Sequence, residues 1–326
     1  MARILIFNVC AKAIEFIRKS ISSPDFIARH RKNKNDFTRN RKLPFHVLIV
    51  FLINLVKGSY QDELDKFFKT LCRFDVAKRV VSKAALTKAR VKLKYEAFVE
   101  LNLHVITYFE KHFRPRLWFG FRLLAIDGST TKLPMTDDVA QHFGVWNVRQ
   151  GAPSPMARVS QLFDVLNKIT VDALIKPKRI GERELAAQHL LNVMPNDLIL
   201  LDRGYPAWWL FKLILSMDAN FCARLSCAKW KLVRKFFRSG LSEKVVTVPV
   251  HSTSIAQCRQ MVLVLSRQRG VSRVMSPQEE HFTICCGLGL KTSSSGQLNI
   301  PSWGGLHHQD WTSCPDGTSE TVQSDV

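Results

Sequence analysis

Two short apolar runs, each ending in an aspartate, constrain the fold of this 326-residue chain more than any other feature. Residues 123–126 (Leu-Leu-Ala-Ile) precede Asp127, and residues 198–201 (Leu-Ile-Leu-Leu) precede Asp202. A short continuous apolar run beside turn residues is typical of a buried strand. We therefore predict two buried strands that bring Asp127 and Asp202 to the same open edge of one sheet. The alternative for each aspartate alone is a turn residue, because Asp-Gly and Asp-Arg-Gly both favour turns.

Two carboxylates at one sheet edge favour a divalent cation. Without a cation Asp127 and Asp202 would repel each other, and a cation between them removes that penalty. Carboxylate oxygens suit Mg²⁺, with Mn²⁺ as a substitute. In two-metal phosphoryl transfer one ion activates the attacking water or 3′-hydroxyl, and the other stabilises the leaving oxygen. Asp127 and Asp202 are therefore our candidate catalytic and metal-binding residues.

The order of predicted elements after residue 115 indicates an α+β fold class. Two strands are expected on either side of Asp127-Gly128, followed by a hairpin that turns at Asn167-Lys168. The pattern then predicts a helix over 182–193, a strand over 198–201, a helix over 207–217 and a strand over 220–224. Such a mixed sheet flanked by helices resembles the ribonuclease-H-like arrangement of polynucleotidyl transferases.

The first 115 residues or so are predicted to be all-α. Apolar residues recur at helical spacing over 1–22, 44–55, 61–70, 82–93 and 95–113. Ser82 is the expected N-cap of a helix whose outer face is basic. Two short helices, a turn and this basic helix can place that face in a DNA major groove, as helix-turn-helix units do. The alternative is an ordinary amphipathic helix with solvated lysines.

The charge of the chain indicates a polyanionic partner. A formal net charge of +21 and a pI near 9.9 fit either nucleic acid or an anionic membrane surface. The charge is uneven, because residues 1–273 carry +26 and residues 274–326 carry −5. Residues 29–42 are a basic segment or, alternatively, a solvated loop. The expected DNA-phosphate contacts of this segment and of the helix over 82–93 are Arg29, Arg31, Lys32, Arg39, Arg41, Lys42, Lys83, Lys88 and Arg90.

Two features of the sequence argue against a membrane. The longest apolar stretch, residues 43–56, is interrupted by polar residues and falls short of the roughly 20 residues that a spanning helix needs. The first residues show no convincing export signal. The eight cysteines are scattered, which fits reduced thiols in a cytosol. We therefore expect a cytoplasmic protein that binds no membrane.

Several motifs in order resemble one family. Residues 124–129 (Leu-Ala-Ile-Asp-Gly-Ser) and 201–205 (Leu-Asp-Arg-Gly-Tyr) are similar to the first and second acidic motifs of bacterial insertion-sequence DDE transposases. They fit the insertion sequence 4 type, in the branch whose third motif is Tyr-x2-Arg-x3-Glu-x6-Lys. Residues 37–45, 82–94 and 161–166 agree in the same order, and the resemblance covers about residues 30–265.

The resemblance implies a DNA transposition enzyme. Such an enzyme cuts and rejoins double-stranded DNA at element ends by Mg²⁺-dependent phosphoryl transfer. Its partners are terminal inverted repeats, target DNA and a second copy on paired ends, and its location is the bacterial nucleoid. Arg203 and Tyr205 belong to the second motif. A mostly β insertion after that motif contacts DNA in this family, and the residues expected to do so here are Lys229, Lys231, Arg234 and Lys235. Trp230, Phe236 and Phe237 would stack on exposed bases or, alternatively, form a core.

The chain departs from the family at its third acidic motif, which is absent from residues 270–326. Residues 283–296 can be encoded so that the frame two bases later reads Tyr-Leu-Leu-Arg-Phe-Gly-Val-Glu. We hypothesise a frameshift upstream of Thr283, which would impair catalysis by removing the third carboxylate. The alternatives are a non-catalytic DNA-binding remnant that occupies terminal repeats, and a ribonuclease or repair nuclease.

The expected organisation has four parts. These are a helical DNA-binding domain (1–115), the first part of a ribonuclease-H-like core (116–225), a basic β insertion (226–270) and an aberrant, disordered tail (271–326).

Overall fold

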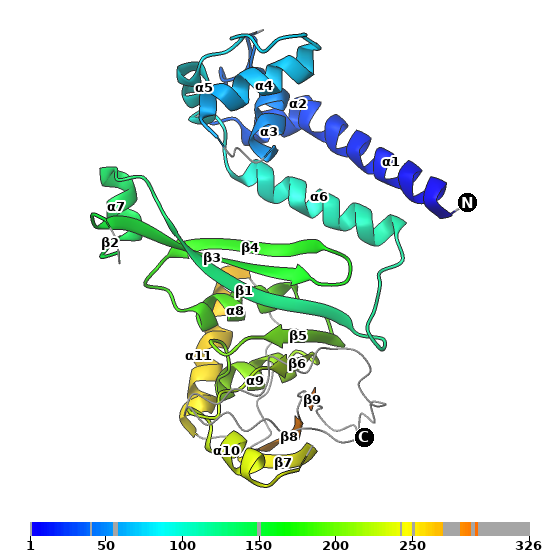
Figure 1. Ribbon diagram of the computed structural model, residues 1–326, viewed down its shortest axis with the longest axis vertical. Coiled ribbons are helices and arrows are strands. Elements are labelled where there is room, and N and C mark those ends of the chain that lie inside the picture. Colours follow the sequence, from blue (N-terminus) through cyan, green and yellow to red (C-terminus); the bar gives the residue numbers. More distant parts are fainter. Residues whose placement is uncertain are drawn as a thin grey trace. The chain divides into compact units, whose positions relative to one another are not determined.

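The computed structural model describes residues 2–39, 41–54, 58–148, 151–241, 243–249, 252–269, 281–287 and 291–292. The chain divides into two compact units, Met1–Arg114 and Pro115–Val326 (Figure 1). The first unit is helical and the second contains a mixed sheet with helices. The predicted α+β class is therefore confirmed.

Six helices form the first unit. They are α1 (Ala2–Ser22), α2 (Pro24–His30), α3 (Phe45–Ile53), α4 (Tyr60–Cys72), α5 (Lys83–Arg90) and α6 (Glu96–His112). The N-caps of α2, α4 and α5 are serines: Ser23, Ser59 and Ser82 each accept a hydrogen bond from the backbone N–H three residues on. The predicted cap at Ser82 is thus present. The core of this unit is built from fully buried side chains, among them Phe26, Phe45, Leu48, Ile49, Phe51, Leu64 and Leu86.

A six-stranded mixed sheet forms the centre of the second unit. Its strands are β1 (Arg122–Lys132), β2 (Val145–Trp146), β3 (Ser154–Asp164), β4 (Ile169–Pro177), β5 (Asp197–Leu201) and β6 (Asn220–Ala223). Strands β3, β1, β5 and β6 lie side by side in that order, and both β4 and β2 pair with β3. The pairs β4–β3, β2–β3 and β3–β1 are antiparallel, whereas β1–β5 and β5–β6 are parallel.

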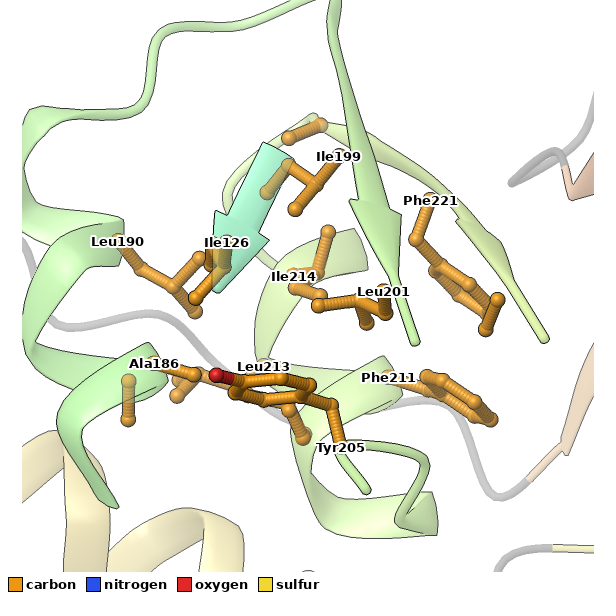
Figure 2. Packing of buried hydrophobic residues seen from close by; sticks show 14 of the residues in the cluster. Ile126, Ala186, Leu190, Ile199, Leu201, Tyr205, Phe211, Leu213, Ile214 and Phe221 are labelled. Carbon is orange, nitrogen blue, oxygen red and sulfur yellow. The ribbon is translucent and has the colours of Figure 1, made fainter. Parts of the chain in front are cut away.

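Helices pack on this sheet and enclose the core. The helices of the second unit are α7 (Asp137–Phe143), α8 (Glu182–His189), the 3-10 turn η1 (Leu190–Asn192), α9 (Trp208–Leu215), α10 (Lys231–Arg238) and α11 (Ser252–Arg269). Figure 2 shows Leu201 and Phe221 from the strands packed over Leu213, Phe211 and Tyr205. The rings of Phe211 and Phe221 stack with centroids 4.1 Å apart. Both predicted apolar runs thus lie in strands of one core, β1 and β5.

The expected turn between two strands at Asp127-Gly128 is wrong. Strand β1 continues through both residues to Lys132, and its partner β3 follows it from Leu124↔Asp164 to Lys132↔Met156. The ladder of hydrogen bonds to β3 outweighs the local preference of Asp-Gly for a turn.

The expected mostly β character of residues 226–270 is also wrong for the described residues. Helices α10 and α11 lie in this segment together with one strand, β7 (Glu243–Pro249). The apolar residues of α10 occupy positions 232, 233, 236 and 237, which is the spacing of one helix face. Strand β7 pairs with β8 (His281–Gly287), and β8 pairs with β9 (Lys291–Thr292). Apart from β8 and β9, residues 271–326 lie outside the described part, and so does the expectation of disorder there.

No helix among the described residues is long and apolar enough to cross a membrane.

Candidate functional site

The register of the sheet brings the two aspartates together. Strands β1 and β5 run parallel, and their last paired residues are Ile126 and Leu201. Asp127 and Asp202 are the next residues on these neighbouring strands, so both carboxylates lie where the parallel pair ends. Both residues are exposed, and the Asp202 side chain is 68% accessible. Side chains with this exposure can reach a ligand outside the sheet.

A buried ion pair fixes this register at the opposite end of the two strands. Arg122 Nε and Nη2 donate to the two carboxylate oxygens of Asp197, at 2.9 and 2.6 Å. Asp197 Oδ2 also accepts a hydrogen bond from the backbone N–H of Met194 at 2.8 Å. Arg122 and Asp197 each precede their aspartate by five residues and face each other in the ladder. A bidentate pair has a fixed geometry, so it holds the strands in the register that aligns Asp127 with Asp202.

The Asp127 carboxylate is oriented by its own backbone. The N–H of Gly128 donates to Asp127 Oδ1 at 2.8 Å. Ser160 Oγ on β3 lies 3.4 Å from the backbone carbonyl oxygen of Asp127 and is its hydrogen-bond donor. Asp202 has a cation nearby, since Arg224 Nη1 lies 3.9 Å from its Oδ1.

The second motif packs against the first through Tyr205. Its ring is buried in the core of the second unit (Figure 2), and its hydroxyl has no hydrogen-bond partner among the described residues. Burial raises the pKa of Tyr205 far above its usual range, and the nearby carboxylates of Glu182 and Asp127 raise it further. A Cβ at Gly128 would lie only 3.2 Å from the Tyr205 hydroxyl, so Gly128 permits this close approach. Arg203, the other expected motif residue, is exposed.

Helix α8 holds the loop of the second motif. Arg183 Nε donates to the carbonyl oxygens of Gly204 and Tyr205, at 3.2 and 3.0 Å. Glu182 forms an ion pair with Arg158 of β3 and lies beside Gly204. Sequence reasoning missed Arg158, Glu182 and Arg183, because they come from two elements and follow no recognisable spacing.

The donor set suits a magnesium ion that is only partly held by protein. Mg²⁺ is often bound through one or two carboxylates, with waters and substrate phosphates completing its six ligands. Asp127 and Asp202 offer two exposed carboxylates on neighbouring strands. Within the described residues no group of three His, Cys, Asp or Glu side chains is placed to hold a metal ion. A third protein ligand is therefore not found in the described part of the chain.

The basic segment 29–42 is joined to the region around α5 and is not a free loop. The backbone N–H of Lys32 donates to the carbonyl oxygen of Lys92 at 2.9 Å, and a β-bridge links Arg31 to Leu93. Asp36 is buried and lies 3.1 Å from Lys92 Nζ. Two basic stretches that are separate in the sequence are therefore neighbours in the structure.

The candidate DNA contacts of the first unit differ in the exposure of their side chains and in the interactions that these already make. Arg29 is engaged in an ion pair of 2.6 Å with Glu100 on α6, which leaves it less able to contact phosphate. Arg90 Nη1 bonds the Tyr60 hydroxyl at 3.3 Å, and its guanidinium lies over that ring. Arg31 is half-buried. The residues with exposed side chains are Arg29, Lys32, Arg39, Arg41, Lys42, Lys83, Lys88 and Arg90.

Helix α10 presents a basic face to solvent. Its apolar side, with Leu232 and Phe236, packs against the core of the second unit. The indole of Trp230 packs edge-on against Trp208, with ring centroids 4.5 Å apart. Trp230 and Phe236 are thus partly buried against the core, whereas Phe237 is 53% exposed. The exposed cations of this region are Lys229, Lys231, Arg234, Lys235 and Arg238.

Comparison with known proteins points to a transposase. The chain is 25% identical over 157 residues to the putative transposase InsZ of Escherichia coli (strain K12), covering 47% of this chain and 51% of that relative. The chain thus spans about half the length of the curated relative it matches. The piggyBac transposase, solved as a synaptic complex with hairpin DNA, has 11% identity and a TM-score of 0.39 over 80% of this chain and 68% of that chain. A TM-score of this size does not establish a shared fold. No family model matches the chain.

Proposed function

We propose that this chain is a transposase of the DDE type, of the insertion sequence 4 group, that acts on DNA at the ends of an insertion sequence. The observation that carries the proposal is the placement of Asp127 and Asp202 on adjacent ends of two parallel strands. The strand order β4-β3-β1-β5-β6, antiparallel on one side and parallel on the other, supports a ribonuclease-H-like core. The sequence similarity to a transposase supports the same function.

In this proposal Asp127 and Asp202 would hold Mg²⁺ or Mn²⁺. When bound, the metal supplies Lewis-acid activation of the nucleophile and charge stabilisation at the phosphate. The protein orients Asp127 through the Gly128 N–H, and holds Asp202 near Asp127 through the β1–β5 register. The basic surfaces of α5, residues 31–42 and α10 bind the DNA backbone, and paired ends are held by a homodimer in the nucleoid.

Phosphate binding by these surfaces has a measurable signature. Each phosphate that a lysine or arginine neutralises contributes about −0.9 to the slope of log K against log salt concentration. A terminal-repeat DNA is therefore expected to bind with a steep salt dependence, to which both units contribute.

A second candidate function is a DNA-binding transposase remnant without catalysis. It is favoured by one observation: the described residues contain no third ligand beside Asp127 and Asp202. Loss of one ligand from a two-metal site reduces turnover far more than DNA binding, since binding depends on the cations. The nucleotide sequence around codons 270–326 tests the cause, because a stop codon in the shifted frame, or the absence of its Glu codon, would remove the frameshift hypothesis.

One experiment separates the two candidates. The full chain and its Asp127→Asn and Asp202→Asn variants are incubated with labelled DNA that contains the ends of the element, with and without Mg²⁺. An active enzyme nicks the DNA at the ends only with Mg²⁺, and both variants abolish nicking but not binding. A non-catalytic remnant binds the DNA, which lowers its mobility in a gel, but does not nick it. Robust nicking that survives both substitutions would contradict the proposed site.

A further inference from the structure

A hydrogen-bonded series of side chains, Asp172, His189 and Ser160, lies behind Asp127. His189 ends α8, and its Nδ1 lies 2.8 Å from Asp172 Oδ2 on β4. Its Nε2 lies 3.0 Å from Ser160 Oγ on β3. His189 is 0% exposed and Ser160 is 1% exposed. Side chains of this kind activate a serine in hydrolases, but a substrate cannot reach a buried Ser160.

The series of hydrogen bonds continues from Ser160 to the backbone of Asp127. Ser160 Oγ lies 3.4 Å from the Asp127 carbonyl oxygen, which is the longest contact of the series. That carbonyl belongs to the same peptide unit as the Gly128 N–H, which donates to Asp127 Oδ1 at 2.8 Å. Because a peptide unit is planar, a hydrogen bond that fixes its carbonyl also fixes the direction of its N–H. The orientation of the Asp127 carboxylate is thus linked to Ser160.

Counting hydrogens shows when all contacts can form together. A serine hydroxyl has one hydrogen, so Ser160 can donate either to His189 or to the Asp127 carbonyl. It donates to Asp127 only if His189 Nε2 carries a hydrogen and donates to Ser160 Oγ. The contact between Nδ1 and Asp172 shares one further hydrogen. The complete series therefore requires a hydrogen on Nε2 of His189.

We propose that Asp172, His189 and Ser160 form a positioning relay that orients the carboxylate of Asp127 for metal binding. The relay rests on the proposed function, in which Asp127 is a metal ligand. None of the three residues touches the metal in this arrangement. They act through the 127–128 peptide, and they join β4, α8 and β3 to β1. The packing of α8 on the sheet is thereby coupled to the geometry of the site.

The test measures the affinity of the full chain for Mn²⁺ alone, by electron paramagnetic resonance of the free ion. Residues that orient a metal ligand change affinity by roughly 10- to 100-fold when they are removed. Ser160→Ala is expected to weaken Mn²⁺ binding about tenfold by that measure, and Ser160→Thr, which keeps the hydroxyl, to restore it. The matched control is Ser216→Ala, which removes a serine hydroxyl bonded to the Leu213 carbonyl at 2.7 Å in the same unit. It is expected to leave Mn²⁺ affinity unchanged.

The outcomes distinguish the relay from the proposed function. If Asp127→Asn binds Mn²⁺ as tightly as the unmodified chain, the proposed metal site is wrong. If Asp127→Asn loses Mn²⁺ while Ser160→Ala and Asp172→Asn retain full affinity, the relay is wrong. The Asp172 side chain is 22% exposed, so its substitution disturbs the core less should Ser160→Ala fail to fold.

A second measurement needs no substitution. In the unmodified protein labelled with ¹⁵N-histidine, the Nε2 of His189 is expected to show the chemical shift of a nitrogen that carries a hydrogen. An Nε2 without a hydrogen would overturn the relay, because Ser160 would then donate to His189 and not to Asp127.

Discussion

At the scale of single residues, the site depends on two close approaches that leave no spare room. Gly128 lies against the Tyr205 hydroxyl and the Val159 carbonyl oxygen, each 3.2 Å from where a Cβ would lie. The first and second acidic motifs therefore meet through a glycine and a tyrosine, and not only through their aspartates. The Tyr205 hydroxyl contributes no hydrogen bond within the described residues.

This geometry predicts how Gly128→Ala behaves. The added methyl group has to displace Tyr205 or Val159, and overpacking of this kind costs about 1–3 kcal/mol of unfolding free energy. Tyr205→Phe alone is expected to be nearly neutral, because the hydroxyl it removes is buried without a partner. Part of the cost of Gly128→Ala is expected to disappear in the Tyr205→Phe background. Urea unfolding of the two single variants and the double variant measures the coupling, and strict additivity would refute it.

At the scale of elements, the parallel pair β1–β5 is the unit that makes the site. Arg122 and Asp197 are 16% and 4% exposed in their side chains, so their ion pair is shielded from water. Removing one partner of a buried pair leaves the other charge uncompensated.

We expect Arg122→Leu to destabilise the second unit by about 3–5 kcal/mol. All tryptophans of the chain lie beyond residue 114, so tryptophan fluorescence during urea unfolding reports on this unit. Arg179→Leu is the control, since Arg179 is exposed and bonds one carbonyl, that of His142. A loss of stability no larger than the control's would show that the pair does not fix the register.

Helix α10 gives a prediction about binding. Replacing Lys231, Arg234 and Lys235 by glutamine removes three exposed charges without touching the apolar side of the helix. If each contacts one phosphate, the slope of log K against log salt becomes shallower by about 2.7 in B-DNA. Unfolding free energy is expected to stay the same. Fluorescence anisotropy with labelled duplex at several salt concentrations tests this, and an unchanged slope excludes α10 from the DNA interface.

Elements with a strong apolar signal could be predicted from the sequence. The runs 123–126 and 198–201, the hairpin around Asn167 and the Ser82 cap are all present. Helix α7 and strand β2 were missed, because seven and two residues are too few to show a period. The relay and the Arg158–Glu182 pair were also missed. Their members come from separate elements, and only the folded sheet and α8 bring them together.

At the scale of the whole molecule, the stability of the helical unit is expected to depend on an ionised carboxylate. In the first unit, Glu100 accepts hydrogen bonds from Arg29 at 2.6 Å and His30 at 2.7 Å, which tie α6 to α2. The bond from Arg29 lowers the pKa of Glu100, although burial opposes the shift. A carboxyl whose pKa is lower in the folded state contributes stability above its ordinary value. That contribution is lost as the pH falls through the lowered value.

The helical unit is therefore expected to lose stability below the ordinary glutamate pKa of 4.5. Glu100→Gln removes the titrating group, so the variant is expected to be less stable than the unmodified chain at pH 7 but to change less below pH 4.5. Urea unfolding followed by far-UV circular dichroism at a series of pH values measures the difference. Parallel pH profiles for the two proteins would show that Glu100 does not contribute.

The pairing of β1 with β5 also affects when the site forms during folding. The Arg122–Asp197 pair joins residues 75 positions apart, and closing so long a loop costs entropy before any contact repays it. The site of Asp127 and Asp202 is consequently expected to form only after this loop closes. Contacts of the helical unit span a similar distance in the sequence, since Arg29 and Glu100 are 71 positions apart. In a nascent chain, however, the basic stretches 29–42 and 83–92 are made before residue 202, so they are present before the two carboxylates can pair.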